Sequence, residues 1–202
     1  MAYQLLLASR NPDKISELRA ILEPYQIRIH TMLDFPDFPD TLEDKDSIFG
    51  NAMKKALEGA RQTGMLCLAD DTGLFIDALK GAPGVFSARY AGPHCSYQDN
   101  LRKVLLQMQD IPERSAHFET AAALADPSGI ISVVSGLVRG QIAMYEQGSN
   151  GFGYDSIFTV EGYQQTYAEM DDETKNRISH RSHALRLIIP AVLRALRIND
   201  NI

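Results

Sequence analysis

The stretch Met65-Leu66-Cys67-Leu68-Ala69-Asp70-Asp71-Thr72-Gly73-Leu74-Phe75 decides the fold of this chain, because it joins an apolar run to two adjacent carboxylates. The apolar residues predict a buried strand, and we expect the strand to run into a turn at Thr72 and Gly73. A buried carboxylate is costly unless it is paired or holds a cation. Asp70 and Asp71 therefore predict a site where one carboxylate holds a hard metal ion such as Mg²⁺ and the other activates water. The alternative is an exposed turn that caps the next segment.

Composition indicates one globular domain, residues 1–202, with a net charge of −6. An acidic chain of this kind is not expected to bind a nucleic-acid backbone. No apolar run approaches the roughly 20 residues that cross a bilayer, and the N-terminal apolar segment is too short for a signal peptide. Cys67 and Cys95 show no metal-ligand spacing. We therefore expect a reduced, cytoplasmic protein with no membrane partner.

Strand and helix patterns alternate along the chain. We expect strands at residues 3–8, 26–31, 65–69, 117–125, 130–139 and 156–160. We expect helices at residues 11–22, 47–63, 97–109 and 179–197, and a turn at 81–84. We expect the strands at 117–125 and 130–139, joined at residues 126–129, to form an antiparallel hairpin. The predicted fold class is therefore α/β with a central mixed sheet and flanking helices.

The segment Ser9-Arg10-Asn11-Pro12-Asp13-Lys14 lies where the first strand gives way to the first helix. Asn11 suits the N-cap and Pro12 the first helical position, so backbone N–H groups and the positive helix end are available to an anion. Arg10 and Lys14 oppose the helix dipole there, which favours an anionic ligand. An ordinary capped helix is the alternative, because the segment lacks the glycines and the Lys-Ser/Thr pair of a Walker A loop.

Two later segments also indicate binding. Residues 148–155 combine three glycines with Phe152 and Tyr154, either of which could stack on a planar base, although a plain turn remains the alternative. Ser179-His180-Arg181-Ser182-His183 opens the last helix, with Lys175 just upstream. The two histidines lack a third zinc ligand, so a phosphate or purine-carbonyl site is favoured over a metal. The alternative is a solvent-exposed basic turn.

Together these segments resemble the inosine triphosphate pyrophosphatase family, and the resemblance spans nearly the whole chain. The family's motifs occur here in order, as Ser-x-Asn-x-x-Lys-x-x-Glu-Leu at 9–18, Asn-Ala-x-x-Lys-Ala at 51–56, Ala-Asp-Asp-Thr-Gly-Leu at 69–74, Gly-Ala-Pro-Gly-Val-Phe-Ser-Ala-Arg-Tyr-Ala-Gly at 81–92, Gly-Phe-Gly-Tyr-Asp at 151–155 and Ser-His-Arg at 179–181. The chain departs from the pattern at Ser9, where Thr is commoner, at Gly50, where Glu is frequent, and at Ser156, where Pro is frequent.

The resemblance implies a two-lobed fold with the site in a cleft between the lobes, a homodimer, and hydrolysis of noncanonical purine nucleoside triphosphates (ITP, dITP, XTP) to the monophosphate and pyrophosphate. It implies that Asp71 is the general base and also holds Mg²⁺, for which Mn²⁺ can substitute, with Glu43 and Asp70 as further metal carboxylates. The implied triphosphate cradle comprises Ser9, Arg10, Asn11, Pro12, Asp13, Lys14 and Lys55. The implied base and sugar pocket comprises Thr72, Phe152, Gly153, Tyr154, Asp155, Lys175, His180 and Arg181.

Two other functions fit part of the sequence. Asp71-Thr72-Gly73 is the tripeptide of aspartic proteases, in which two carboxylates share a proton, and a dimer of this chain could assemble such a pair. Those proteases are nearly all β, whereas this chain has four helix patterns. A catalytically inactive nucleotide sensor would use the same pocket, but it leaves Glu43, Asp70 and Asp71 unexplained.

Overall fold

A computed structural model describes residues 3–198, and the contacts within it divide the chain into two compact units. Unit 1 consists of Met1–Asp71, Thr120–Gly136 and Ser182–Ile202. Unit 2 consists of Thr72–Glu119 and Leu137–Arg181. The division into two units agrees with the predicted pair of lobes, while the predicted cleft stays a prediction.

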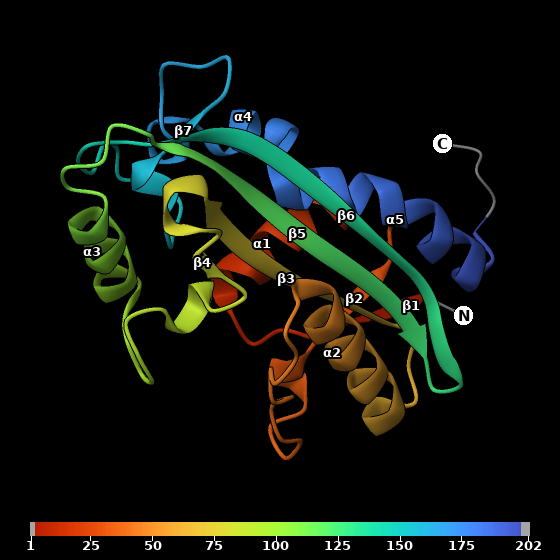
Figure 1. Ribbon diagram of the computed structural model, residues 1–202. Coiled ribbons are helices and arrows are strands. Elements are labelled where there is room, and N and C mark those ends of the chain that lie inside the picture. The colour runs from red at the N-terminus through yellow and green to blue at the C-terminus, as the bar shows by residue number, and fades with distance from the viewer. Residues whose placement is uncertain (1–2, 199–202) are drawn as a thin grey trace. The chain divides into compact units, whose positions relative to one another are not determined.

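Helices and strands alternate as predicted, and they build a mixed α/β fold (Figure 1). The α-helices are α1 (Pro12–Leu22), α2 (Ile48–Thr63), α3 (Tyr97–Gln107), α4 (Asp172–Ile178) and α5 (His180–Leu196). The strands are β1 (Gln4–Leu7), β2 (Arg28–Thr31), β3 (Cys67–Ile76), β4 (Pro83–Gly84), β5 (Ser115–Asp126), β6 (Gly129–Ile142) and β7 (Phe158–Val160). Neighbouring strands follow the order β2-β1-β3-β5-β6-β7, and β4 pairs with β3.

In unit 1, a core of leucines packs around β1 and the start of β3, next to the candidate site residues. β1 pairs in parallel with β2 and with the start of β3, where Leu7 lies opposite Leu68. Leu5 and Leu7 pack with apolar side chains of α1 and α5 in one buried cluster. Each fully buried leucine contributes roughly 1.5–3 kcal/mol relative to an exposed one. This packing therefore supports the segment that follows β1 and the first half of β3, which contains Asp70 and Asp71.

Close packing of α2 on β3 positions two polar side chains. Asn51, Lys55 and Gly59 are four residues apart and buried, so they share one face of α2. A Cβ at Gly59 would lie 2.8 Å from Cys67 Sγ of β3, so the glycine lets the helix approach the strand closely without displacing this side chain. Because alternate residues of a strand share a face, Asp71 lies on the same side of β3 as Cys67. The face of α2 therefore brings Asn51 and Lys55 to Asp71.

Unit 2 has a core rich in aromatic rings. Phe118 of β5 packs edge-on against Phe158 of β7, with ring centroids 4.7 Å apart. Tyr167 lies 5.5 Å from Phe158 and adds a stacked ring to the cluster. β7 pairs antiparallel with β6, and β4 pairs antiparallel with β3, which confirms that the sheet is mixed. The segment 143–157 precedes β7 in the sequence and α4 follows it, so both are connected to this core.

The predicted turn at Thr72 and Gly73 is wrong. β3 continues unbroken from Cys67 to Ile76, and both carboxylates lie inside it. Gly73 serves close packing here, because a Cβ at this position would lie 2.6 Å from the ring of Phe75 and 2.9 Å from the Gly84 carbonyl oxygen. A glycine that permits contact between strands cannot be told from a turn glycine by local sequence alone.

Other differences from the predicted elements are small. The segment 81–84 contributes Pro83 and Gly84 to β4, and the predicted strand at 156–160 begins as the 3-10 helix Asp155–Ile157. The helix α4 was not predicted, because seven residues are too few to show a helical period, although Asp171 caps it by accepting from the Thr174 N–H. Within residues 3–198, no helix has the length and apolar character needed to cross a membrane.

Candidate active site

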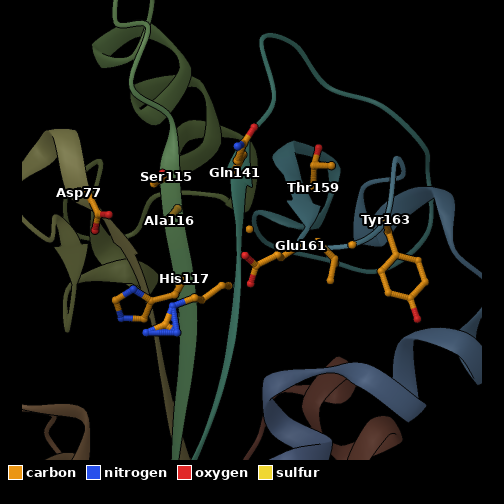
Figure 2. Close-up of a pocket in the computed structure, with 12 residues that line it drawn as sticks. Asp77, Ser115, Ala116, His117, Gln141, Thr159, Glu161 and Tyr163 are labelled. Atoms are coloured by element: carbon orange, nitrogen blue, oxygen red, sulfur yellow. The ribbon is translucent and has the colours of Figure 1, made fainter.

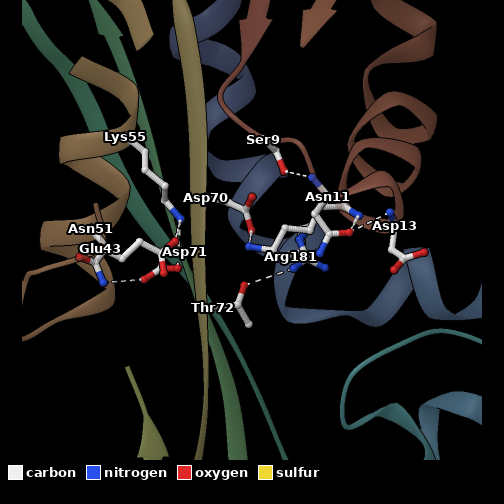
Figure 3. A network of polar contacts seen from close by, with 11 residues as sticks. Ser9, Asn11, Asp13, Glu43, Asn51, Lys55, Asp70, Asp71, Thr72 and Arg181 are labelled. Atoms are coloured by element: carbon white, nitrogen blue, oxygen red, sulfur yellow. Dashed lines mark hydrogen bonds and ion pairs between the residues drawn. The ribbon is translucent and has the colours of Figure 1, made fainter. Parts of the chain in front are cut away.

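Asp71 lies in a polar group that we call the acidic cluster, formed by Glu43, Asn51, Lys55 and Asp71 (Figure 3). The Nζ atom of Lys55 is 3.1 Å from Asp71 Oδ1 and 2.8 Å from Glu43 Oε1. Asn51 Nδ2 donates to Asp71 Oδ2 over 3.1 Å. The Asp71 residue is only 6% exposed. One ammonium therefore holds two carboxylates together in a site largely shielded from water.

The charges in the acidic cluster oppose its burial. Burial raises the pKa of Asp71, Lys55 lowers it and Glu43 raises it, so the pKa stays above its ordinary value. Burial alone would lower the pKa of Lys55, but Asp71, Glu43 and Asp70 more than reverse this, so Lys55 is firmly protonated. A carboxylate with a raised pKa accepts a proton more readily than an ordinary aspartate, which suits a general base.

Asn51 is a site residue that our residue-by-residue prediction missed. It is fully buried, and its Oδ1 accepts from the Lys45 N–H over 3.0 Å, which leaves its amino group for Asp71. The amide is thus held in one orientation from both ends. The sequence contained the signal, because Asn51 lies one helical turn before Lys55 and shares its face.

Asp70 belongs to a different contact. Successive residues of a strand point to opposite faces, so Asp70 turns away from the acidic cluster. Its carboxylate, 2% exposed, pairs with Lys14 Nζ at 3.2 Å. Among residues 3–198, no three His, Cys, Asp or Glu side chains are close enough together to hold a metal ion. The predicted set of Glu43, Asp70 and Asp71 is therefore split, with Glu43 and Asp71 sharing Lys55.

The segment from Ser9 to Lys14 forms the capped helix start that was predicted. Asn11 Oδ1 accepts from the Asp13 N–H at 2.9 Å and from the Lys14 N–H at 3.3 Å, and Ser9 Oγ accepts from the Asn11 N–H. Pro12 occupies the first helical turn and is exposed. The backbone N–H groups of Asp13 and Lys14 that we expected to meet an anion are thus already bonded to Asn11.

Arg10, in contrast, is committed to a loop of its own unit. Its guanidinium donates to the carbonyl oxygens of Met32, Phe35 and Phe38 and pairs with Asp40 at 2.7 Å. These contacts occupy Nε and both terminal nitrogens of the side chain. Arg10 therefore fastens the segment 32–40, and this arrangement gives no support to the predicted contact with a triphosphate.

In unit 2, the glycine-rich segment folds around a buried ion pair. Asp155 Oδ2 accepts from the Phe152 N–H and from Lys175 Nζ, each over 2.8 Å. A Cβ at Gly151, whose φ is +74°, would lie 2.2 Å from that same oxygen. The glycine thus admits the Asp155 carboxylate rather than a ligand. Lys175 Nζ also lies 4.9 Å from the centroid of the Phe152 ring.

Arg181 completes this group, which we call the ring pocket and define as Thr72, Phe152, Lys175 and Arg181. Arg181 Nη2 donates to Thr72 Oγ1 over 3.3 Å (Figure 3). The Cζ atom of Arg181 lies 5.7 Å from the centroid of the Phe152 ring. Arg181 is 3% exposed, whereas Phe152 is partly exposed. Both cationic groups lie over the Phe152 ring, so hydrogen-bond donors and an aromatic ring that could contact a planar ligand are close together.

Two predicted pocket residues pack into the core of unit 2. Tyr154 is 6% exposed and its hydroxyl donates to the Ser87 carbonyl oxygen over 2.8 Å. Burial raises the pKa of Tyr154, so this hydroxyl stays protonated. His180 is 4% exposed and stacks on Phe118, with centroids 4.6 Å apart. Gly153, between Phe152 and Tyr154, has a φ of +66° and lets the chain reverse there.

A separate cavity of about 410 Å³ in unit 2 contains none of the predicted residues (Figure 2). Its polar side chains include Asp77, His117, Gln141 and Glu161. Phe75 stacks on the His117 ring at 5.0 Å. Acidic and basic groups are mixed along this wall, so its charge favours neither an anion nor a cation.

Comparisons with known proteins agree with the motifs. The sequence profile of the Ham1 family matches residues 5–191. A Streptomyces avermitilis protein named dITP/XTP pyrophosphatase is 46% identical over 194 residues, which cover 94% of this chain and 96% of that protein. A Rhodopirellula baltica protein of the same name is 41% identical over 201 residues, which cover 98% of this chain and 97% of that protein. The solved structure of a HAM1 protein from Coxiella burnetii matches with a TM-score of 0.86 and 38% sequence identity. The match covers 95% of this chain and 99% of that protein's chain.

The contacts of Arg10 generate a stability prediction. We expect Arg10→Ala to lower the free energy of unfolding by about 1–3 kcal/mol, because the carbonyl groups of Met32, Phe35 and Phe38 lose their donor. Urea unfolding measures this loss, and Arg19→Ala, at an exposed arginine of α1, is the control with little expected change. Unchanged stability together with a large rise in the KM for the substrate would instead support the predicted role of Arg10 in binding the triphosphate.

Proposed function

This chain belongs to the Ham1 family, and on that premise we propose that it hydrolyses noncanonical purine nucleoside triphosphates such as ITP, dITP and XTP. The products are the nucleoside monophosphate and pyrophosphate, so the enzyme removes deaminated purines from the nucleotide pool. The observation that carries the proposal is the buried Lys55 ammonium between Glu43 and Asp71, next to Asn51. Pyrophosphate release measured across ITP, XTP, GTP and ATP tests it directly.

Asp71 acts as the general base in this reaction. Its carboxylate takes a proton from water as the water oxygen bonds to phosphorus, and the phosphoanhydride bond between the α- and β-phosphates breaks. Pyrophosphate leaves with the electron pair of that bond. Asn51 fixes the orientation of the carboxylate through Oδ2, and Lys55 contacts Oδ1. Such a displacement needs positioned water and neutralised charge more than covalent help from the protein.

The donor chemistry of the acidic cluster fits Mg²⁺. Glu43 and Asp71 supply hard carboxylate oxygens that already share one cation, the ammonium of Lys55. Mg²⁺ is usually held by one or two carboxylates together with substrate phosphates and waters, so two carboxylates are enough. A bound Mg²⁺, or Mn²⁺ in its place, would neutralise phosphate charge. We propose that Glu43 and Asp71 hold it, and that Asp70 supports the site through Lys14.

The ring pocket is suited to a 6-oxopurine. Phe152 offers an aromatic face, while Lys175 and Arg181 carry only hydrogen-bond donors. The C6 oxo group of hypoxanthine or xanthine is an acceptor, whereas the C6 amino group of adenine is a donor. A buried Arg181 therefore favours the oxo form and leaves unpaired donors against adenine. Ser9, Asn11 and Lys14 remain our candidates for the triphosphate.

Neither alternative function is supported. An aspartic protease needs two carboxylates that share a proton, but the direct ionic partner of Asp71 is Lys55. The relatives named above carry the name of an enzyme, which also disfavours an inactive sensor. Resemblance to the family supports a homodimer in the cytoplasm, and the net charge of −6 supports the absence of a nucleic-acid partner.

The role of Asp71 leads to the sharpest prediction. We expect Asp71→Asn to lower kcat for ITP by about 10²–10⁴-fold, because a neutral amide cannot accept the proton of water. Nucleotide binding, measured by calorimetry with the same variant, should be largely retained. A variant that kept more than about a third of the wild-type kcat would exclude Asp71 as the base.

Metal dependence is tested at Glu43. We expect excess EDTA to abolish hydrolysis, and Glu43→Gln to raise the Mg²⁺ concentration for half-maximal rate by about 10-fold or more. Asp44→Asn is a matched control, because Asp44 is the next residue but pairs with Lys54 near the surface. Full activity in EDTA, or equal effects of the two substitutions, would contradict the proposed metal site.

Base selectivity is tested at Arg181. We expect kcat/KM for ITP and XTP to lie far above that for GTP, with GTP near or above ATP. Arg181→Ala should lower kcat/KM for ITP by about 10-fold or more and change the value for ATP much less, because the lost donor matches only the oxo group. Arg177→Ala, at an exposed arginine of α4, is the control. Equal losses for both nucleotides would show that Arg181 serves the phosphates.

A further inference from the structure

Tyr97, the first residue of α3, lies against the aromatic side chain of the ring pocket. Its ring centroid is 5.8 Å from that of Phe152, and the two planes are inclined by 40°. The Tyr97 residue is 44% exposed, so unit 2 does not bury this ring in its core. No motif in the sequence marked Tyr97, and the reaction described above makes no use of it.

The first turn of α3 is capped by hydrogen bonds and contacts the segment that leads to Phe152. Ser96 Oγ accepts from the Asp99 N–H, and Asp99 Oδ2 accepts from the Ser96 N–H, which forms a complete capping box. Gln98 Nε2 donates to Glu146 Oε1 over 2.6 Å. Tyr97 therefore approaches Phe152 from a fixed backbone, while its own side chain retains exposed surface.

We infer that Tyr97 forms a second aromatic wall of the base site and helps to determine affinity for the nucleobase, an inference that rests on the proposed function. Carbon atoms in contact lie about 3.5 Å apart, so a planar base between two parallel rings needs them about 7 Å apart. The present separation of 5.8 Å is short of this by only about 1 Å. A base between the rings therefore requires the partly exposed Tyr97 ring to move outward by about 1 Å and to turn from its 40° inclination until it is parallel to Phe152.

The position of Tyr97 separates binding from chemistry. A ring that stacks on the base contributes equally to the substrate complex and the transition state, because the reacting bonds lie among the phosphates. Loss of such an interaction raises KM and leaves kcat unchanged. A residue that merely held α3 in place would instead lower stability and change both constants together.

The experiment compares Tyr97→Phe, Tyr97→Leu and Tyr97→Ala in the full chain, with Tyr145→Ala as a control at a tyrosine of the same unit that is 65% exposed. We expect Tyr97→Leu and Tyr97→Ala to raise KM for ITP about 5- to 20-fold with kcat within about twofold of wild type. Tyr97→Phe keeps the ring and should resemble wild type. All three should unfold at nearly the wild-type urea midpoint.

A second measurement needs no catalysis. The chain contains no tryptophan, so Tyr97→Trp introduces a single indole reporter beside Phe152. We expect inosine monophosphate to quench its fluorescence by stacking, while pyrophosphate alone leaves the fluorescence unchanged. Quenching that pyrophosphate reproduces would overturn the inference.

The outcomes distinguish this inference from the proposed function. If wild type hydrolyses ITP and Tyr97→Ala has the same KM for ITP as wild type, Tyr97 does not form part of the base site and the inference is overturned. If Tyr97→Phe and Tyr97→Ala lose kcat and stability together, the role is structural and the inference is also overturned. Failure of wild type to release pyrophosphate from any purine triphosphate would count against the proposed function, and the fluorescence result would then decide on Tyr97 independently.

Discussion

The ion pair that Lys55 makes with both Glu43 and Asp71 is the interaction on which the unit 1 site depends. An isolated buried carboxylate would protonate or draw in water, because burial disfavours its charge. The Lys55 ammonium lowers the pKa of Asp71, but burial raises it further, so the pKa of this carboxyl stays above its ordinary value. Removal of one partner from such a buried group leaves an uncompensated charge, so the members of the acidic cluster must be retained together.

The candidate site in unit 2 is built around positive charge, whereas the acidic cluster of unit 1 contains two carboxylates. Lys175 and Arg181 bring two cations beside Phe152, and the Asp155 carboxylate compensates Lys175. Asp71 is the last residue of the first segment of unit 1, and the next residue, Thr72, begins unit 2 and accepts the Arg181 hydrogen bond. Under the proposed function, the residue that activates water and a residue of the ring pocket are therefore consecutive positions of one strand, β3.

Local signals in the sequence predicted local structure well. Asn11 and Ser47 cap α1 and α2, Gly64 ends α2, and the order of strands and helices follows the hydrophobic periods. The same signals failed where long-range contacts decide the outcome. Gly73 suggested a turn but permits the approach of β4, and Arg10 suggested an anion site but binds carbonyls more than twenty residues away. Local sequence cannot reveal partners that the fold alone brings together.

The contact between Gly59 and Cys67 has a consequence for how natural variants of this chain should be interpreted. A methyl group at position 59 would overlap Cys67 Sγ, so either this buried side chain or α2 would have to shift. Asn51 and Lys55 lie on the same helical face, so a shift of α2 would move them away from Asp71. A substitution of Gly59, which has no polar side chain, could therefore lower the catalytic activity. A survey of variants that scores only polar or charged side chains would class this substitution as having no effect on activity.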